Sequence, residues 1–129
     1  MAPGTASWDR TEPSRAFSKR YFERVGKMPN MSQAGVYSST RHYLEAVGAV
    51  GTVETAAVMQ KMKDTPINDF YGTNGHIRED GRMVHDFYLV EAKKPSESKY
   101  AWDYFKILTI PVEKAFLPLS RSRCPLVKR

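Results

Sequence analysis

The side chains of this sequence that could do chemistry are few, and they lie far apart along the chain. The three histidines are His42, His76 and His85, and none has a second histidine or a cysteine at the short spacing of zinc ligands. A transition metal needs such ligands to converge on one point. The sequence therefore predicts no metal site. It also lacks the Gly-Lys-Ser/Thr signature of a phosphate loop, so we expect no cofactor.

Acid–base and nucleophilic chemistry has no better support. Glu79 and Asp80 are adjacent carboxylates, but they stand in a predicted turn, where water is expected to keep their pKa values ordinary. Ser38 lies in a predicted helix and lacks the strained turn that presents a catalytic serine. His85 and Asp86 form a remaining pair, with no nucleophile or oxyanion donor converging on them. We therefore predict no catalytic residue and no enzyme activity.

One segment, SQAGVY at residues 32–37, has more promise for binding. It opens a predicted helix with small residues, an amide and a phenol. The first N–H groups of a helix have no partner inside the helix, and they favour an anion such as a carboxylate. The alternative interpretation is ordinary capping, with Tyr37 packed in the core. The sequence leaves both interpretations open.

The elements that would position these residues begin with helices. Apolar residues at helical spacing predict three of them, over residues 11–26, 30–49 and 53–63. Pro13 suits the first turn of the first helix, and Thr52 is expected to cap the third. The second helix has a broad apolar stripe, typical of a helix that packs against a sheet. That stripe consists of Val36, Tyr37, Thr40, Tyr43, Leu44 and Val47.

Strand signals follow in residues 75–93, where Asp80-Gly81 separates two runs and predicts a tight hairpin. Its second strand is expected over residues 83–92, and alternation predicts another over residues 102–110. Three helices followed by an antiparallel meander of about three strands make an α+β unit. Three helices cannot cover both faces of such strands. Apolar surface should therefore stay exposed, and it marks either an interface, through which copies of the chain could form a homo-oligomer, or a missing partner segment.

Length and composition indicate one globular domain, with 129 residues of which 41% are hydrophobic and 26% charged. Residues 1–8 are small and polar, and we expect a disordered leader there, followed by one folded unit over residues 9–129. The start of the sequence lacks the features of an export signal.

A net charge of +6 makes a small nucleic-acid-binding module an alternative, with Tyr104, Phe105 and Lys106 on an exposed face. The basic residues alternate with acidic ones rather than cluster, which favours a solvated surface and no nucleic-acid partner. Cys124 is the single cysteine, and it is either a free thiol or half of a disulfide whose partner lies elsewhere.

Three long stretches of the sequence resemble a known family: SKRYFERVGKMPNMSQAGVYSSTRHYLEAV, VMQKMKDTPINDFYGTNGHIREDGRMVHDFYLVEAKKPSESKYAWDYFKIL and CPLVKR. The resemblance covers residues 8–129 and is to the C-terminal part of periplasmic substrate-binding proteins of ABC transporters, of the branched-chain amino acid (extracellular ligand-binding receptor) type. It implies part of a two-lobed α/β fold, the periplasmic-binding-protein type I fold, which captures a ligand between its lobes.

The resemblance also implies a function and specific site residues. In the full-length protein the ligand would be an amino acid or another small carboxylate, the partner an ABC permease, and the location the periplasm. Residues 33–37 match the loop–helix junction that approaches the cleft, so Gln33, Gly35 and Tyr37 are the candidate ligand-binding residues. Tyr37 would supply the side chain and Gly35 a close backbone approach. Cys124 would be half of a disulfide with a cysteine in the rest of such a protein.

Overall fold

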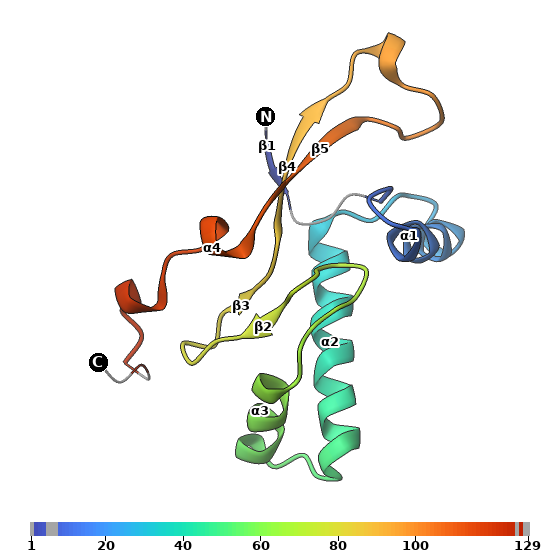
Figure 1. Ribbon diagram of the computed structural model, residues 1–129. Helices are drawn as coiled ribbons and strands as arrows, with labels where there is room; N and C mark the ends of the chain where they lie inside the picture. The colour runs from blue at the N-terminus through green and yellow to red at the C-terminus, as the bar shows by residue number, and fades with distance from the viewer. Residues whose placement is uncertain (1, 5–7, 126, 128–129) are drawn as a thin grey trace.

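The computed structural model describes residues 2–4, 8–125 and 127. Its first half is helical, as predicted, with α1 at Glu12–Val25, α2 at Met31–Val50 and α3 at Thr55–Asp64. The side chain of Thr11 caps α1, and Gly26 ends it with a φ of 73°. Figure 1 shows α3 lying against the lower half of the long helix α2.

Two helix boundaries differ from the prediction. The side chain of Glu54, not Thr52, caps α3 by accepting hydrogen bonds from the N–H groups of Ala56 and Ala57. Thr52 accepts instead from the N–H of Glu54 and shapes the turn before the cap. The second helix ends at Val50 rather than at Ala49, and Gly51 follows it with a φ of 70°, in the left-handed conformation that glycine readily adopts.

The hairpin around Asp80-Gly81 is confirmed. It joins β2 at His76–Ile77 to β3 at Met83–Val84, and Gly81 has a φ of 76°. The N–H of Arg78 donates to the carbonyl of Arg82 at 3.0 Å, which closes a three-residue loop.

The prediction of one continuous strand over residues 83–92 is wrong. The structure breaks it at His85 and Asp86, because His85 is buried with Nδ1 2.6 Å from the carbonyl oxygen of Asp86. Beyond the break, β4 at Phe87–Ala92 pairs with β5 at Phe105–Ile110. The last strand begins at Phe105, three residues later than predicted. Trp102 has a φ of 65°, which lies outside the extended region that strand residues occupy.

The start of the chain differs from the predicted leader. Ala2–Gly4 form β1, which pairs antiparallel with β4, so the sheet order is β1-β4-β5. An unpaired β4 edge explains this strand, because a free edge offers N–H and carbonyl groups to any nearby chain. Positions 1 and 5–7 of the predicted leader lie outside the described residues. Beyond β5 come a short helix α4 at Val112–Ala115 and a 3₁₀ turn at Leu119–Arg121.

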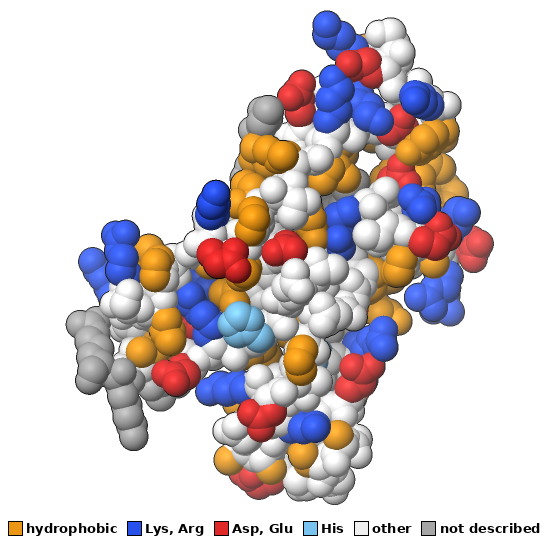
Figure 2. All heavy atoms as spheres, in the orientation of Figure 1, with side chains coloured by type: hydrophobic (Ala, Val, Ile, Leu, Met, Phe, Trp, Pro, Cys, Tyr) orange, Lys and Arg blue, Asp and Glu red, His pale blue; other side chains and the backbone are white. Residues whose placement is uncertain are grey.

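The buried core is small and lies mainly where the helices meet the loops and the hairpin. Its apolar members are Phe17, Ala34, Ala46, Val58, Ile67, Val84 and Tyr88. A compact monomer of 14.7 kDa exposes about 6,900 Å², and this chain exposes 8866 Å², roughly 1,900 Å² more. Figure 2 shows hydrophobic side chains at the surface between patches of charge. The prediction that apolar surface stays exposed is confirmed.

Candidate functional site

Three aromatic rings from three separate segments meet beside α2. Phe17 of α1 stacks on Phe70 of the loop after α3, with ring centroids 4.1 Å apart. Tyr37 of α2 lies 5.0 Å from Phe17 and 5.6 Å from Phe70. Phe17 is buried, whereas Tyr37 keeps 42% of its surface exposed. The cluster therefore has a packed inner side and an open outer side.

The loop that carries Phe70 is held by a carboxylate. Asp69 accepts hydrogen bonds from the N–H groups of Tyr71 at 2.8 Å and Gly72 at 3.0 Å through one oxygen. The other oxygen accepts from the hydroxyl of Ser38 on α2 at 2.5 Å. Side-chain turns of this kind fix the backbone of a loop. Phe70 is thus locked against the helices.

Arg10 also binds this loop and connects it to the sheet. Its guanidinium donates to the carbonyl of Phe70 at 2.7 Å and to the hydroxyl of Tyr88 on β4 at 2.8 Å. Ser14 donates to the Phe70 carbonyl as well, at 3.0 Å. Among the described residues no carboxylate forms an ion pair with Arg10. The half-buried guanidinium of Arg10 therefore connects the Phe70 loop to β4 by donating to uncharged oxygen atoms.

An open groove of about 850 Å³ runs along the outer side of this aromatic cluster between α1 and α2. Two further hollows, of about 300 Å³ and 470 Å³, adjoin it through Phe17 and Tyr37. The groove is lined by Phe17, Tyr21, Ser32, Gln33, Val36, Tyr37, Thr40, Arg41, Leu44 and Glu45. An apolar surface with a few polar groups at its margin is what a small-molecule site requires.

The three predicted binding residues are placed differently. Gln33 and Tyr37 both line the groove, one helical turn apart. Gly35 faces away from it, and a Cβ added there would stand 3.3 Å from the hydroxyl of Tyr71. The structure thus brings Gln33 and Tyr37 together and gives Gly35 a close approach to another side chain.

The predicted anion site at the start of α2 is occupied by a capping box. The side chain of Asn30 accepts from the N–H groups of Ser32 at 2.8 Å and Gln33 at 3.4 Å. The Gln33 side chain in turn accepts from the N–H of Asn30 at 2.9 Å. An anion would have to displace these bonds, so ordinary capping describes this helix start better.

Other candidate groups of the sequence have structural partners. His42 is buried with Nε2 3.0 Å from the carbonyl oxygen of Met62, and His76 lies opposite Val84 across the hairpin. Within the described ranges, no three His, Cys, Asp or Glu side chains are grouped to hold a metal ion. Lys106 forms an ion pair with Glu97 at 2.6 Å, which reduces the basic character of the face predicted for nucleic acid.

Asp80 differs from its prediction. Hydrogen bonds from the Arg78 guanidinium lower the pKa of Asp80 to about 2, where the sequence predicted an ordinary value. Only 7% of the Asp80 side chain is exposed.

The segment after the hairpin and β5 contains Cys124, a half-buried free thiol. No helix in the described part of the chain combines the length and apolarity needed to cross a membrane.

Comparison with known proteins gives a consistent result. Residues 1–99 match the family described as periplasmic binding protein. A solved periplasmic binding protein from Burkholderia mallei is 47% identical over 98% of this chain, with a TM-score of 0.91. A branched-chain amino acid ABC transporter periplasmic ligand-binding protein from Burkholderia xenovorans LB400 is 42% identical over 96% of the chain, with a TM-score of 0.90. No curated protein matches the sequence.

The extent of these matches confirms the family and the fold that the sequence predicted. The chain spans about a third of the length of the two solved structures, 34% of one and 33% of the other. Binding rather than catalysis is the role that the family's description gives, in agreement with the prediction that the chain is not an enzyme. With a family match over residues 1–99 and close structural agreement over nearly its whole length, this chain belongs to the periplasmic binding protein family.

Proposed function

We propose that this chain forms part of a periplasmic solute-binding protein that serves an ABC importer for branched-chain amino acids or related small carboxylates. The observation that carries the proposal is the 42% identity, over 96% of the chain, to a ligand-binding protein of that description. Proteins of this kind close two lobes over a ligand, and the closed form is what a membrane permease would recognise.

The groove between α1 and α2 supports this proposal. Its volume of about 850 Å³ lies within the range of small-molecule sites. Tyr37 offers an exposed aromatic surface to an aliphatic side chain, and the Gln33 amide can reach a polar group at the groove's margin. Gly35 acts indirectly, because it lets Tyr71 pack against α2. The groove is open on one side, so a second lobe has to cover the ligand.

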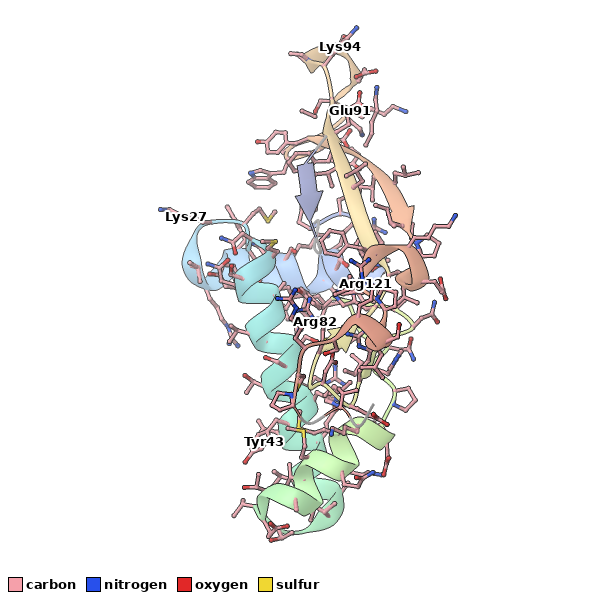
Figure 3. The ribbon with its side chains drawn as sticks, turned by 90° about the vertical axis from the view of Figure 1, so that its left-hand side faces the viewer. Lys27, Tyr43, Arg82, Glu91, Lys94 and Arg121 are labelled. Carbon is pink, nitrogen blue, oxygen red and sulfur yellow. The ribbon has the colours of Figure 1, made fainter. Side chains whose placement is uncertain are left out.

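A chimeric protein tests the proposal. This chain replaces the matching third of the Burkholderia xenovorans protein, and the affinity for leucine, isoleucine and valine is measured by calorimetry. We expect Tyr37→Ala to weaken binding by about tenfold, since burying an aromatic contact contributes about 1.5 kcal/mol. Tyr43→Ala is the matched control, because Tyr43 is as exposed as Tyr37 and does not line the groove. Figure 3 shows the position of Tyr43 on α2. Equal affinities of the two variants would remove Tyr37 from the site.

We also propose that Cys124 is half of a disulfide with a cysteine of the rest of the binding protein. Its half-buried position in the tail and the oxidising character of a periplasm support the pairing. Mass spectrometry of the protein isolated from the periplasm without reductant measures the thiol directly. A free Cys124 in that material would contradict the pairing.

A further inference from the structure

The loop that carries Phe70 supports the groove from behind. Phe70 does not line the groove, but its ring stacks on Phe17 with centroids 4.1 Å apart and lies 5.6 Å from the ring of Tyr37. Phe17 and Tyr37 both line the groove. Aromatic rings at such distances pack in preferred relative orientations. The place of the Phe70 ring therefore influences where the two groove-lining rings lie.

The same loop is seated on one turn of α2. Its first contact is at Gly35, where an added Cβ would stand 3.3 Å from the hydroxyl of Tyr71. Its second contact is at Ser38, which is 2% exposed and donates its hydroxyl to Asp69 at 2.5 Å. Residues three apart share a face of a helix. Tyr37 belongs to the same turn and lines the groove, so the loop and the groove occupy two sides of one turn of α2.

Asp69 joins the internal structure of the loop to this turn of α2. One carboxylate oxygen accepts from the N–H groups of Tyr71 and Gly72, and the other accepts from Ser38. The N–H of Asp69 donates to the carbonyl of Gly72 at 3.0 Å, which closes the loop on itself. Loss of the carboxylate would leave three donors without this acceptor, and an unsatisfied buried donor such as the Ser38 hydroxyl is costly.

The loop is also fixed from the side of α1. Ser14 donates to the carbonyl of Phe70 at 3.0 Å, and Arg10, just before α1, donates to it at 2.7 Å. These bonds hold the backbone at Phe70, whereas the bond between Asp69 and Ser38 sets its distance from α2. The Phe70 ring is thereby held between the two helices that form the groove.

We propose that Asp69 is a positioning residue of the groove, and that it sets how long an aliphatic side chain the groove accepts; this inference rests on the proposed function above. Asp69 does not line the groove, so it acts through the Phe70 ring on Phe17 and Tyr37. An apolar pocket distinguishes side chains that differ by one methylene by about 10- to 200-fold. That discrimination requires a closely packed wall, because a wall that can move accommodates either side chain.

The test uses the chimera described above and measures the dissociation constants of leucine and valine by calorimetry. Asp69→Ala releases the loop from α2, and we expect the ratio of the two constants to change by about threefold or more. Ser38→Ala removes only the bond to α2 and should change the ratio in the same direction, which keeps the proposal testable if Asp69→Ala does not fold.

Two further variants separate positioning from other effects. Asp69→Asn keeps an oxygen that accepts from the loop N–H groups, and its amide can donate to the Ser38 hydroxyl, so it should restore the original ratio. Asp64→Ala is the control, because Asp64 is exposed at the end of α3 and bonds only to Gln60 there, at 2.9 Å. It should leave the ratio unchanged.

The ratio distinguishes positioning from a loss of stability. A variant that is merely less stable has a smaller binding-competent fraction, which multiplies both apparent dissociation constants by the same factor. An unchanged ratio in Asp69→Ala and Ser38→Ala, in a chimera that binds leucine, would overturn the role of Asp69 and leave the proposed function intact. A change in Asp69→Asn as large as in Asp69→Ala would also overturn it. An unsubstituted chimera that binds neither amino acid would remove both proposals.

Discussion

At the scale of single residues, Arg78 and Asp80 show how a charge pair organises the hairpin and the tail together. Arg78 donates to Asp80 at 2.6 Å and, through another nitrogen, to the carbonyl of Leu117 at 2.7 Å. The sequence predicted the turn from Asp80-Gly81, but it gave no sign that a tail residue would share the arginine. Contacts between distant segments leave no local pattern, so the low pKa of Asp80 could be found only in the structure.

The Asp80 pair predicts a pH-dependent contribution to stability. Because the pKa of Asp80 is about 2 in the folded state and about 3.9 in an unfolded chain, its contribution is present above pH 4 and is lost as the pH falls through 2. We expect Asp80→Asn to lower the urea midpoint at neutral pH, with a difference that shrinks toward pH 2. Glu79→Gln, at the exposed neighbour, is the control. A difference that is constant with pH would contradict this role of the carboxylate.

Arg10 carries a second prediction at this scale. Its hydrogen bonds join the Phe70 loop to Tyr88 of β4. A hydrogen bond to a charged group typically contributes about 1.5–3 kcal/mol to the free energy of unfolding. Arg10→Ala should therefore lower the free energy of unfolding by about 2 kcal/mol. The exposed Lys19→Ala on α1 should change it by less than about 0.5 kcal/mol. Urea denaturation followed by circular dichroism compares the two variants. Equal midpoints would show that the Arg10 hydrogen bonds do not stabilise the fold.

At the scale of elements, the bounds of α2 follow from the sequence, whereas its buried face does not. The apolar periodicity predicted a helix over residues 30–49, and the structure confirms the helix with bounds at Met31–Val50. The buried face was not predicted, because it consists of the small or polar residues Ala34, Ser38, His42 and Ala46. A hydropathy pattern identifies residues that are apolar. Close packing of α2 against α3 and the Phe70 loop depends instead on small side-chain volume, which hydropathy does not measure. The predicted apolar stripe instead lies open, with Val36 and Leu44 more than half exposed.

The two faces of α2 should respond differently to substitution. Ala46 is 4% exposed, so Ala46→Leu overpacks the interior and should lower the free energy of unfolding by about 1–3 kcal/mol. Leu44 is 59% exposed, so Leu44→Ala should change it by less than about 0.5 kcal/mol. Thermal or urea unfolding distinguishes these effects. A larger loss for Leu44→Ala would mean that the stripe is covered in solution.

At the scale of the whole molecule, a small set of hydrogen bonds and aromatic contacts connects the helical half to the sheet. Arg10 makes one of these connections, and the indole N–H of Trp8 makes another, since it donates to the carbonyl of Trp102 at 2.7 Å. Phe22 of α1 packs on Trp102, with ring centroids 5.0 Å apart. Figure 3 shows Lys94 at the far tip of the β4–β5 connection, well away from the helices. This open arrangement leaves much apolar surface uncovered. Such exposure is expected of a chain that covers about a third of the length of the solved proteins it matches.

The sequence predicted the family, and it predicted three helices followed by antiparallel strands, because both depend on long runs of residues in a fixed order. It did not predict β1 at Ala2–Gly4. It did not predict the aromatic cluster around Phe70, which lies in a stretch without periodicity. An Asx-turn signal exists there, since Asp69 precedes Tyr71 and Gly72 at the spacing that such turns use. That signal indicates a fixed loop, but it does not say which helix the loop contacts.

Calorimetric titration of the chimera with leucine is the decisive measurement for the proposal that this chain is part of a ligand-binding protein. We expect saturable binding of one ligand per chimera, as two lobes close over the groove. A correctly folded chimera that binds neither leucine, isoleucine, valine nor any related small carboxylate would contradict it.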